Sequence, residues 1–483
     1  MVFSSVVFVF LFLPVVITLY YGVNASFRNT LLLLASLVFY AWGEVFFVYV
    51  MLATIVANYV YGLAIGCFSR ERARLAVLAL AVATNLALLF SYKYANFMVD
   101  NLNLLLGVLG APTINLEPVH LPIGISFFIF HSISYIVDIY RKDSPPQKNP
   151  LDLALYIALF PQLVAGPIIR YHDVSDQLQQ RTHSVDLFLS GTNRFIIGLS
   201  KKVLIANTLS LPADKIFAIA PGQLSLPLAW LGIVCYSLQI YYDFSGYSDM
   251  AIGMGRMFGF QFKENFQWPY SSLSIREFWR RWHISLSTWF RDYLYIPLGG
   301  DRGGAARTHF NLLAVFFLCG LWHGASWTFV FWGFYHGAFL VLERNRFGRW
   351  LQRCPGILQR AYVILVFMLG WVFFRSETLS GALAYIGCMF NVFRFSVFEQ
   401  PFQMYVNNLV IAAILWGICF SFPVVPAIRS LFVDRLGHGG GLGAALSRNG
   451  YALAMTAAVI VAFAASLSLL AAQTHNPFIY FRF

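Results

Sequence analysis

The chain has 483 residues, of which 59% are hydrophobic and only 11% are charged, and its formal net charge is +12. A soluble globular chain carries roughly 25% charged residues. The deficit here runs along the whole sequence, which excludes a soluble enzyme and a protein with a single membrane anchor. In a membrane protein, basic residues gather in short cytoplasmic loops. We therefore expect an all-α polytopic protein in contact with the lipid bilayer, and no nucleic acid among its partners.

No long polar or low-complexity stretch divides the chain, so the sequence predicts a single transmembrane domain over residues 1–483. Within it we expect N-terminal helices over 1–145, a core with re-entrant segments over 150–345, and C-terminal helices over 355–483.

Basic residues allow the first half of the chain to be threaded through a membrane. Arg28 follows the first apolar run, and further basic clusters at 70–74 and 140–148 follow later runs. Because basic loops stay cytoplasmic, these positions fall on the inner side and the N-terminus falls outside. Lys201 and Lys202 are expected to mark another cytoplasmic edge.

The segment 151–171, "LDLALYIALFPQLVAGPIIRY", is apolar but interrupted by Pro161, Gly166 and Pro167. Proline removes a backbone donor and bends a helix, and irregular backbone at membrane depth must be covered by protein or line a cavity. We expect this segment to re-enter or to line a cavity. Further helices are expected near 186–208, 224–258, 360–375, 380–394, 405–422 and 451–472, with a flexible loop near 437–447.

Residues 270–309 form the polar middle of the chain, where arginines alternate with tryptophans and tyrosines. This composition is typical of a membrane–water boundary. Guanidinium groups there could equally hold a soluble anionic cosubstrate, and both interpretations remain open for most of these residues. His283 lies among three arginines in "RRWHIS", and nearby positive charge favours its neutral imidazole.

A second apolar stretch, residues 310–342, has arginines on both flanks. If both flanks are cytoplasmic, the segment enters the membrane and returns in legs of about 12–18 residues, or roughly 18–27 Å of helix. Because a bilayer core is roughly 30 Å thick, we expect a re-entrant pair. Its turn would lie deep in the protein at "CGLWHGAS", where Gly320 and Gly324 permit a tight backbone.

This stretch contains two histidines, His323 and His336. An ionisable group inside a membrane is a functional hypothesis by default, and neutral imidazole is a good general base near pH 7. The alternative is a buried histidine that only packs. The place of His323 at the predicted break, facing a cavity, favours function. His336 lies 13 residues further along, on another helix face, and we expect it to be structural.

Other polar motifs favour supporting roles. "DFSGYSDM" carries Ser245 and Asp249 without the sequence of a nucleophile elbow, which favours a polar network lining the chamber. His131 and Asp138 lie about two helical turns apart on one face and indicate a structural hydrogen-bond network. No HExxH, Walker loop, GxGxxG or clustered His/Cys set occurs, so we expect no metal site and no tightly bound cofactor.

Long motifs give the chain a family resemblance. It resembles the membrane-bound O-acyltransferase family, and within it the bacterial membrane components that serve alginate O-acetylation. The motifs, which cover nearly the whole chain, are "SYKYANF", "LPIGISFFIFHSISYIVDIYR", "FPQLVAGPI", "YYDFSGYSDMAIGMGRMFGFQFKENFQWPY", "SIREFWRRWHISLSTWFRDYLYIPLGG", "GLWHGASWTFVFWGFYHG" and "NPFIYFRF".

The resemblance implies a ring of roughly a dozen tilted helices around a thin central region, with a funnel from each side. It implies that His323 of the "LWHG" motif is the active histidine. The second family position is an asparagine or aspartate in many eukaryotic members and falls here on His283, which could orient the donor or stabilise negative charge. The residues expected to bind substrate are Arg280, Arg281, Trp322, Ser245 and Asp249.

The function implied is O-acetyl transfer in the bacterial inner membrane. Acetyl groups from a cytoplasmic donor, expected to be acetyl-CoA, cross to a periplasmic relay or acetyltransferase partner that modifies an exported polysaccharide such as alginate. The resemblance leaves cellulose or another exopolysaccharide open as the final acceptor. The residues alone also leave open a transporter or export component and a membrane scaffold without activity, since broken helices and buried histidines occur in transporters too.

Overall fold

The computed structural model describes residues 1–391, 401–435 and 442–472, and every regular element within these ranges is helical, which confirms the all-α fold. The motif "NPFIYFRF" and residues 437–441 of the expected flexible loop lie outside the described residues. From Leu442 onward the expected loop is wrong, because α22 begins there.

The helices follow one another closely along the chain. The N-terminal helices are α1 (Leu13–Gly22), α2 (Arg28–Ala41), α3 (Phe47–Cys67), α4 (Glu71–Lys93), α5 (Ala95–Val108) and α6 (Ile125–Arg141). The middle of the chain forms α7 (Pro150–Ala158), α8 (Phe160–Leu163), α9 (Tyr171–Gln179), α10 (Val185–Ser200), the π-helix η3 (Lys201–Asn207), α11 (Thr208–Phe217), α12 (Leu226–Met257), α13 (Ile275–Arg281), α14 (Ile284–Phe290), α15 (Gly304–His323) and α16 (Trp327–Arg344). The remaining helices are α17 (Arg346–Leu351), α18 (Gly356–Arg375), α19 (Leu379–Phe390), α20 (Asn408–Phe420), α21 (Val424–Arg429) and α22 (Leu442–Ala472). Short 3-10 or π segments are η1 (Phe8–Phe12), η2 (Ala25–Phe27), η4 (Pro269–Ser271), η5 (Arg291–Tyr295), η7 (Phe402–Met404) and η8 (Ser430–Arg435).

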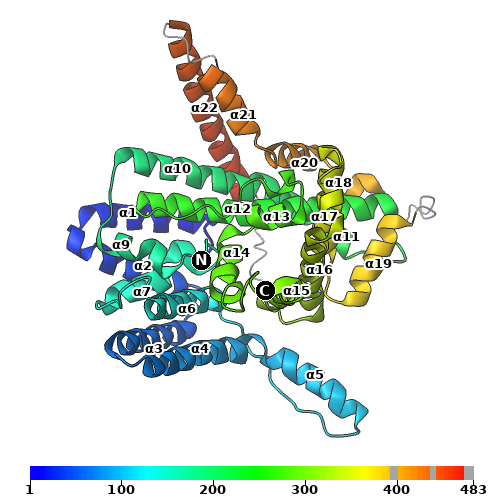
Figure 1. The fold of residues 1–483 in the computed structure, drawn as a ribbon. Coiled ribbons are helices and arrows are strands. Elements are labelled where there is room, and N and C mark those ends of the chain that lie inside the picture. The colour runs from blue at the N-terminus through cyan, green and yellow to red at the C-terminus, as the bar shows by residue number, and fades with distance from the viewer. Residues whose placement is uncertain (392–400, 436–441, 473–483) are drawn as a thin grey trace.

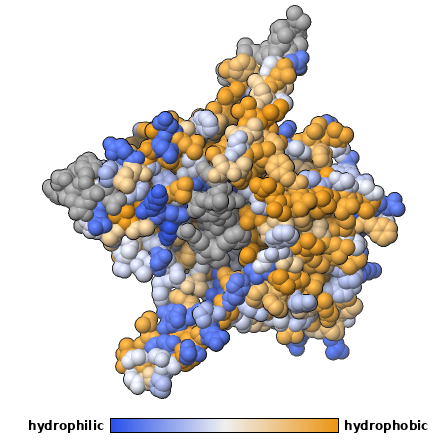
Figure 2. All heavy atoms as spheres, turned by 180° about the vertical axis from the view of Figure 1, so that it is seen from behind, coloured by the Kyte–Doolittle hydropathy of each residue, from blue (hydrophilic) through white to orange (hydrophobic). Residues whose placement is uncertain are grey.

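The described helices contain several that could span a bilayer. Six are long and apolar enough to cross a membrane, and the bent pair formed by α20 and the helix after it would make a seventh. Figure 1 shows α10 and α12 side by side along one edge of the molecule, α15 and α16 side by side along another, and α3 with α4 at the end away from α10. Figure 2 shows a broad apolar surface over one face, as a chain surrounded by lipid requires.

Two helices are enclosed by protein. In α12, 26 of the 32 residues are buried, and in α6, 14 of 17 are buried. Both helices carry buried carboxylates, Asp243 in α12 and Asp138 in α6, and such groups need polar partners inside the protein rather than lipid. These two helices therefore form the centre against which the shorter, broken segments pack.

Glycines set the distance between α10 and α12. A Cβ atom on Gly198 would lie 2.5 Å from the carbonyl oxygen of Gly246, and one on Gly253 would lie 2.6 Å from that of Gly191. Each helix thus carries two glycines seven residues apart on its contact face. Small residues let helix backbones approach closely in membranes, where dispersion contacts drive helix association.

Ion pairs join α12 to the two lysines that the sequence predicts at a cytoplasmic edge. Lys201 and Lys202 lie within a continuous helical run over residues 185–217, and their place at a membrane edge stays a prediction. Lys202 Nζ lies 2.6 Å from Asp243 Oδ1, with both side chains buried, and Lys201 Nζ lies 2.7 Å from Asp249 Oδ2. Carboxylates of α12 neutralise both lysines, so neither needs to reach water.

The predicted break in 151–171 is confirmed. The chain leaves α7 at Ala158, forms the single turn α8, and does not resume a helix until Tyr171. Residues 152–169 are buried without interruption. Protein therefore covers the irregular backbone, as membrane depth demands.

The break between α15 and α16 is confirmed, but the predicted short first leg is wrong. α15 has 20 residues and α16 has 18, and α15 passes as a membrane span by itself. At 1.5 Å per residue, α15 covers roughly 30 Å. The distance from the start of α15 to the turn at 324–326 is thus about the thickness of a bilayer core.

We predict that Gly246→Ala destabilises the fold. Its Cβ would lie 2.7 Å from the Gly198 carbonyl oxygen, and forcing a methyl group into a packed core costs about 1–3 kcal/mol. Thermal unfolding in detergent measures the change. The matched control is Gly387→Ala in α19, where nothing lies within 4 Å of the added atom. Equal unfolding temperatures for the two variants would contradict the role of close helix approach.

Candidate active site

The candidate site begins with the close crossing of α15 and α16. A Cβ atom on Gly320 would lie 2.3 Å from the carbonyl oxygen of Phe329, and one on Gly333 would lie 2.2 Å from that of Phe316. Gly324 has extended backbone, with φ −171°, and a Cβ there would collide with the Phe329 ring. Gly320 and Gly324 thus permit the tight backbone that the sequence predicts at this turn, because neither position has room for a Cβ atom.

His323 is the last residue of α15 and is buried among aromatic rings. Its ring centroid lies 4.9 Å from that of Trp322, 5.1 Å from that of Trp332 and 5.3 Å from that of Phe374. Its Nδ1 atom has no hydrogen-bond partner among the described residues. The imidazole is therefore enclosed and keeps a nitrogen free for chemistry.

His283 occupies the N-cap position of α14 with left-handed backbone, at φ 45° and ψ 54°. A non-glycine residue with positive φ is uncommon, although histidine, asparagine and aspartate adopt it more readily than most. The Ile284 amide donates to the carbonyl oxygen of Asn265 at 2.9 Å. This bond fixes the turn that places the His283 ring inside the protein.

Asn265 also determines which nitrogen of His283 carries the proton. The Asn265 Oδ1 atom accepts hydrogen bonds from the Ser285 backbone amide at 3.1 Å and from the Ser285 hydroxyl at 2.9 Å, which identifies it as the oxygen. His283 Nδ1 lies 3.2 Å from the same oxygen, so Nδ1 must be the donor. In the neutral ring Nε2 then carries the lone pair, and Nε2 is buried without a partner among the described residues.

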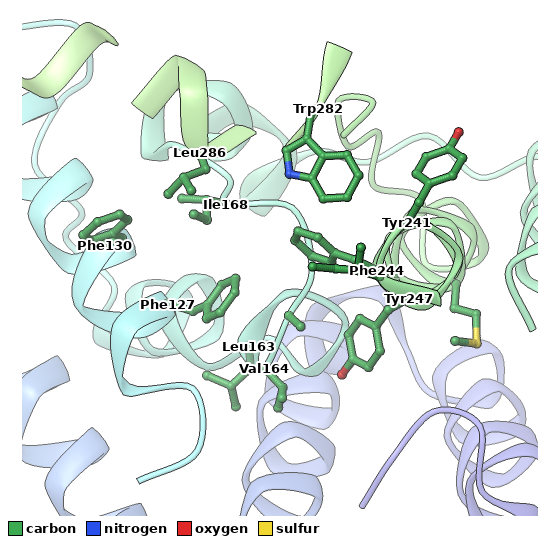
Figure 3. Packing of buried hydrophobic residues seen from close by; sticks show 14 of the residues in the cluster. Phe127, Phe130, Leu163, Val164, Ile168, Tyr241, Phe244, Tyr247, Trp282 and Leu286 are labelled. Atoms are coloured by element: carbon green, nitrogen blue, oxygen red, sulfur yellow. The ribbon is translucent and has the colours of Figure 1, made fainter. Parts of the chain in front are cut away.

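The structure brings the two candidate histidines together around Trp322. The Trp322 ring centroid lies 4.9 Å from that of His323 and 6.2 Å from that of His283. Phe244 of α12 meets the His283 ring edge-on at 4.5 Å. Figure 3 shows Phe244 directed toward Phe127 of α6, which closes this region with apolar side chains from both central helices.

A cavity of about 210 Å³ runs along α15 toward His323. It follows one face of that helix through Leu312, Val315, Phe316 and Cys319, and His323 is the next position on the same face, one turn further on. The other lining residues are Arg276, Trp279, Arg280, Leu286, Ser287, Phe290, Leu340 and Arg344. The cavity thus combines three arginines with an apolar wall, and it ends one helical turn before the buried imidazole.

Helix α13 holds two of these arginines in place. The backbone amides of Ile275 and Arg276 donate to the Glu343 carboxylate at 2.6 and 3.0 Å. A carboxylate at a helix N-terminus is favourable because it meets unpaired amides and the positive end of the dipole. Glu343 belongs to α16, so the arginines and the cavity wall are fixed to the same helix hairpin.

The remaining predicted substrate-binding residues lie in three different surroundings. Arg280 is exposed and lines the cavity, whereas Arg281 pairs with Glu277 at 2.6 Å. Asp249 is bound by Arg194 of α10 and by Lys201 of η3. Ser245 is buried in α12, and its hydroxyl has no partner in the described part of the chain. The described contacts connect neither Ser245 nor Asp249 to the two histidines.

The residues expected to be structural are buried as well. His336 is fully buried beside Trp279 and Trp332. Asp138 accepts hydrogen bonds from the His172 ring at 2.9 Å and from the Tyr293 hydroxyl at 2.6 Å. The hydrogen bond to Asp138 raises the pKa of His172.

Sequence reasoning missed Asn265, Lys93 and Tyr94. Lys93 Nζ donates to the carbonyl oxygen of Trp322, and the Tyr94 hydroxyl donates to that of Leu321 at 2.8 Å. The signal that could have found Lys93 is a lysine at the end of a long apolar run, inside the motif "SYKYANF" of the resemblance. Asn265 has a weaker signal, since asparagine is common in surface turns.

Comparison with known proteins identifies the class: the chain belongs to the membrane-bound O-acyltransferase family, whose sequence model matches residues 142–375. Over its full length it is 44% identical to the probable alginate O-acetylase AlgI of Azotobacter vinelandii and 43% identical to that of Pseudomonas aeruginosa, with all of each protein covered. It is also 37% identical to the peptidoglycan O-acetyltransferase of Helicobacter pylori, over 79% of this chain and 78% of that protein.

We predict that Asn265→Ala lowers the rate of acyl transfer, because His283 loses the acceptor that fixes its proton on Nδ1. Asn265→Asp should retain more activity, since a carboxylate still accepts from His283 and Ser285. A loss of about 10²-fold for the alanine variant corresponds to a displacement of roughly 1 Å. The measurement is the rate of acyl transfer by folded protein, with the exposed Asn345→Ala as control. Equal rates for all three variants would show that the hydrogen bond has no role.

Proposed function

We propose that this protein is a membrane O-acetyltransferase of the bacterial inner membrane that takes acetyl groups from cytoplasmic acetyl-CoA. The acetyl group leaves toward a periplasmic relay or acetyltransferase partner, and the final acceptor is an exported polysaccharide, with alginate favoured. The full-length similarity to proteins named alginate O-acetylases supports alginate over cellulose or another glycan. All of the chain acts as one transmembrane domain, with residues 150–345 as its catalytic core.

The observation that carries this proposal is the cavity along α15. Its arginines, Arg276, Arg280 and Arg344, suit the phosphates of a nucleotide-bearing donor. Its volume of about 210 Å³ is below the roughly 300–1,000 Å³ of sites that enclose drug-sized ligands. It therefore admits a narrow thioester arm and keeps the nucleotide outside. The arm points along the helix face that ends in His323.

The proposed chemistry uses both histidines. His323 takes the proton from the acceptor hydroxyl as that oxygen attacks the thioester carbonyl, and the same proton passes to the departing sulfur. The C–S bond breaks, the C–O bond forms, and the products are the acetyl ester and free CoA. Alternatively, His323 itself attacks and carries the acetyl group between the two steps. His283 remains neutral, and its Nε2 lone pair stabilises the positive charge that develops on His323.

Trp322 and the two outer arginines complete the proposed site. Trp322 separates the imidazoles from the rest of the protein and limits the space for the acyl group. Arg280 binds donor phosphate at the cavity mouth. Arg281 pairs with Glu277 and holds α13 in position beside it. Ser245 and Asp249 contribute to substrate binding indirectly. Both lie in α12, the helix whose Phe244 packs against the His283 ring.

We predict that His323→Ala abolishes acetyl transfer while the protein stays folded. The test supplies radiolabelled acetyl-CoA to purified protein in nanodiscs. General base catalysis contributes about 10²–10⁴-fold, so a loss of that size is expected. His309→Ala, on the same helix, is the control. His283→Asn, which keeps the left-handed backbone, should lower the rate less. A His323→Ala variant that turns over donor like wild type would remove the enzyme assignment in favour of a transporter or scaffold.

We also predict that Arg280→Glu weakens donor use through electrostatics. A reversed charge at the cavity mouth should lower kcat/KM for acetyl-CoA about 10-fold, and the deficit should shrink as salt screens it. The maximal rate should change little, because Arg280 does not touch the reacting atoms. The exposed Arg302→Glu serves as control. An unchanged kcat/KM at low salt would exclude this face of the cavity as the donor entrance.

A further inference from the structure

The C-terminal end of α15 is capped by side chains from a distant part of the chain. A helix leaves its last four carbonyl groups without intrahelical partners. In α15 the Gly320 carbonyl still accepts from the Gly324 amide at 3.2 Å. The Leu321 carbonyl instead accepts from the Tyr94 hydroxyl at 2.8 Å, and the Trp322 carbonyl accepts from Lys93 Nζ. Consecutive carbonyls directly before His323 are thus bound by consecutive residues at the α4–α5 junction.

Lys93 is unusual for a lysine in a membrane helix. It ends the apolar helix α4, it is 9% exposed, and it forms no ion pair within the described part of the chain. Its further contacts are the Ser126 hydroxyl of α6 at 3.3 Å and the Trp322 ring, whose centroid lies 5.7 Å from Nζ. A lysine amine buried in a membrane protein without an ion-pair partner is costly and is a functional hypothesis by default.

The surroundings of the Lys93 amine show what stabilises it at this position. The C-terminal end of a helix carries partial negative charge, and an amine placed there is favourable. The Trp322 ring adds a second electron-rich surface. Both features belong to the peptide that leads into His323, and Lys93 also interacts electrostatically with His323 itself. The lysine is thus directed at the one helix end that carries the candidate catalytic imidazole.

We infer that Lys93 and Tyr94 are positioning residues for acetyl transfer, and that they clamp the end of α15 so that the His323 imidazole is held at the end of the donor cavity. This inference rests on the proposed function for its activity measurement. The clamp connects the "SYKYANF" motif, which the reaction does not otherwise use, to the active histidine. If the end of α15 frayed, the His323 side chain would lose its fixed position. A misplacement of about 1 Å costs on the order of 10²-fold in rate.

The test compares Lys93→Met, Lys93→Arg and Tyr94→Phe with wild type and with Tyr92→Phe. The control tyrosine lies in the same turn of α4, and no hydrogen bond of its hydroxyl is described. We expect Lys93→Met to lower kcat about 10²-fold with the KM for acetyl-CoA unchanged, because the donor cavity is untouched. Lys93→Arg should recover part of the rate, since it still donates. Tyr94→Phe, which removes a single oxygen atom, should show a smaller loss, and Tyr92→Phe none.

A second measurement needs no acetyl transfer. Hydrogen exchange at the Gly324 amide reports whether the helix end frays, and it should quicken in Lys93→Met and Tyr94→Phe but not in Tyr92→Phe. Wild-type kcat in Lys93→Met and Tyr94→Phe would overturn the inference, as would a loss seen only in KM or matched by lost folded protein. If wild type itself transfers no acetyl from acetyl-CoA, the proposed function fails, while the exchange data still decide whether the clamp exists.

Discussion

Inside a membrane no water is available to the carbonyl groups at the end of a helix, and α15 ends at His323 within the protein. Each unpaired carbonyl must find a donor from the chain itself. The α4–α5 junction supplies two donors, Lys93 and Tyr94, and the helix can stop where the imidazole is needed. The α4–α5 junction therefore contributes to the site although Lys93 and Tyr94 do not line the cavity along α15.

The second support is α12, which carries Phe244 to the His283 ring. Close glycine contacts and buried ion pairs fix it against the helix formed by α10, η3 and α11. Neither kind of contact tolerates a shift, because a displaced backbone would leave charged lysines without partners. The two histidines thus stand on separate rigid supports, and both imidazoles pack against Trp322. Such a site keeps its geometry while a donor arm enters and leaves.

Much of this organisation follows from the sequence. The all-α fold, the break at 324–326 and the burial of His323 follow from apolar runs, glycines and flanking arginines. The length of α15 does not, because the helix begins at Gly304, in the polar segment before the apolar stretch that was expected to start at residue 310. The ion pairs of Lys201 and Lys202 could not be predicted either, because their partners on α12 are invisible to local pattern. The role of Asn265 could not be predicted for the same reason, because it depends on hydrogen bonds to His283 and Ser285 that form only in the folded protein.

The left-handed backbone at His283 also bears on how this family diversified. Histidine, asparagine and aspartate are among the non-glycine residues that adopt such a backbone most readily, and these are the residues that the resemblance places at this position in different branches. Exchange among them leaves the turn and the path of α14 intact. A lineage could therefore alter the chemistry at this position in a single mutational step, without first remodelling the scaffold around it.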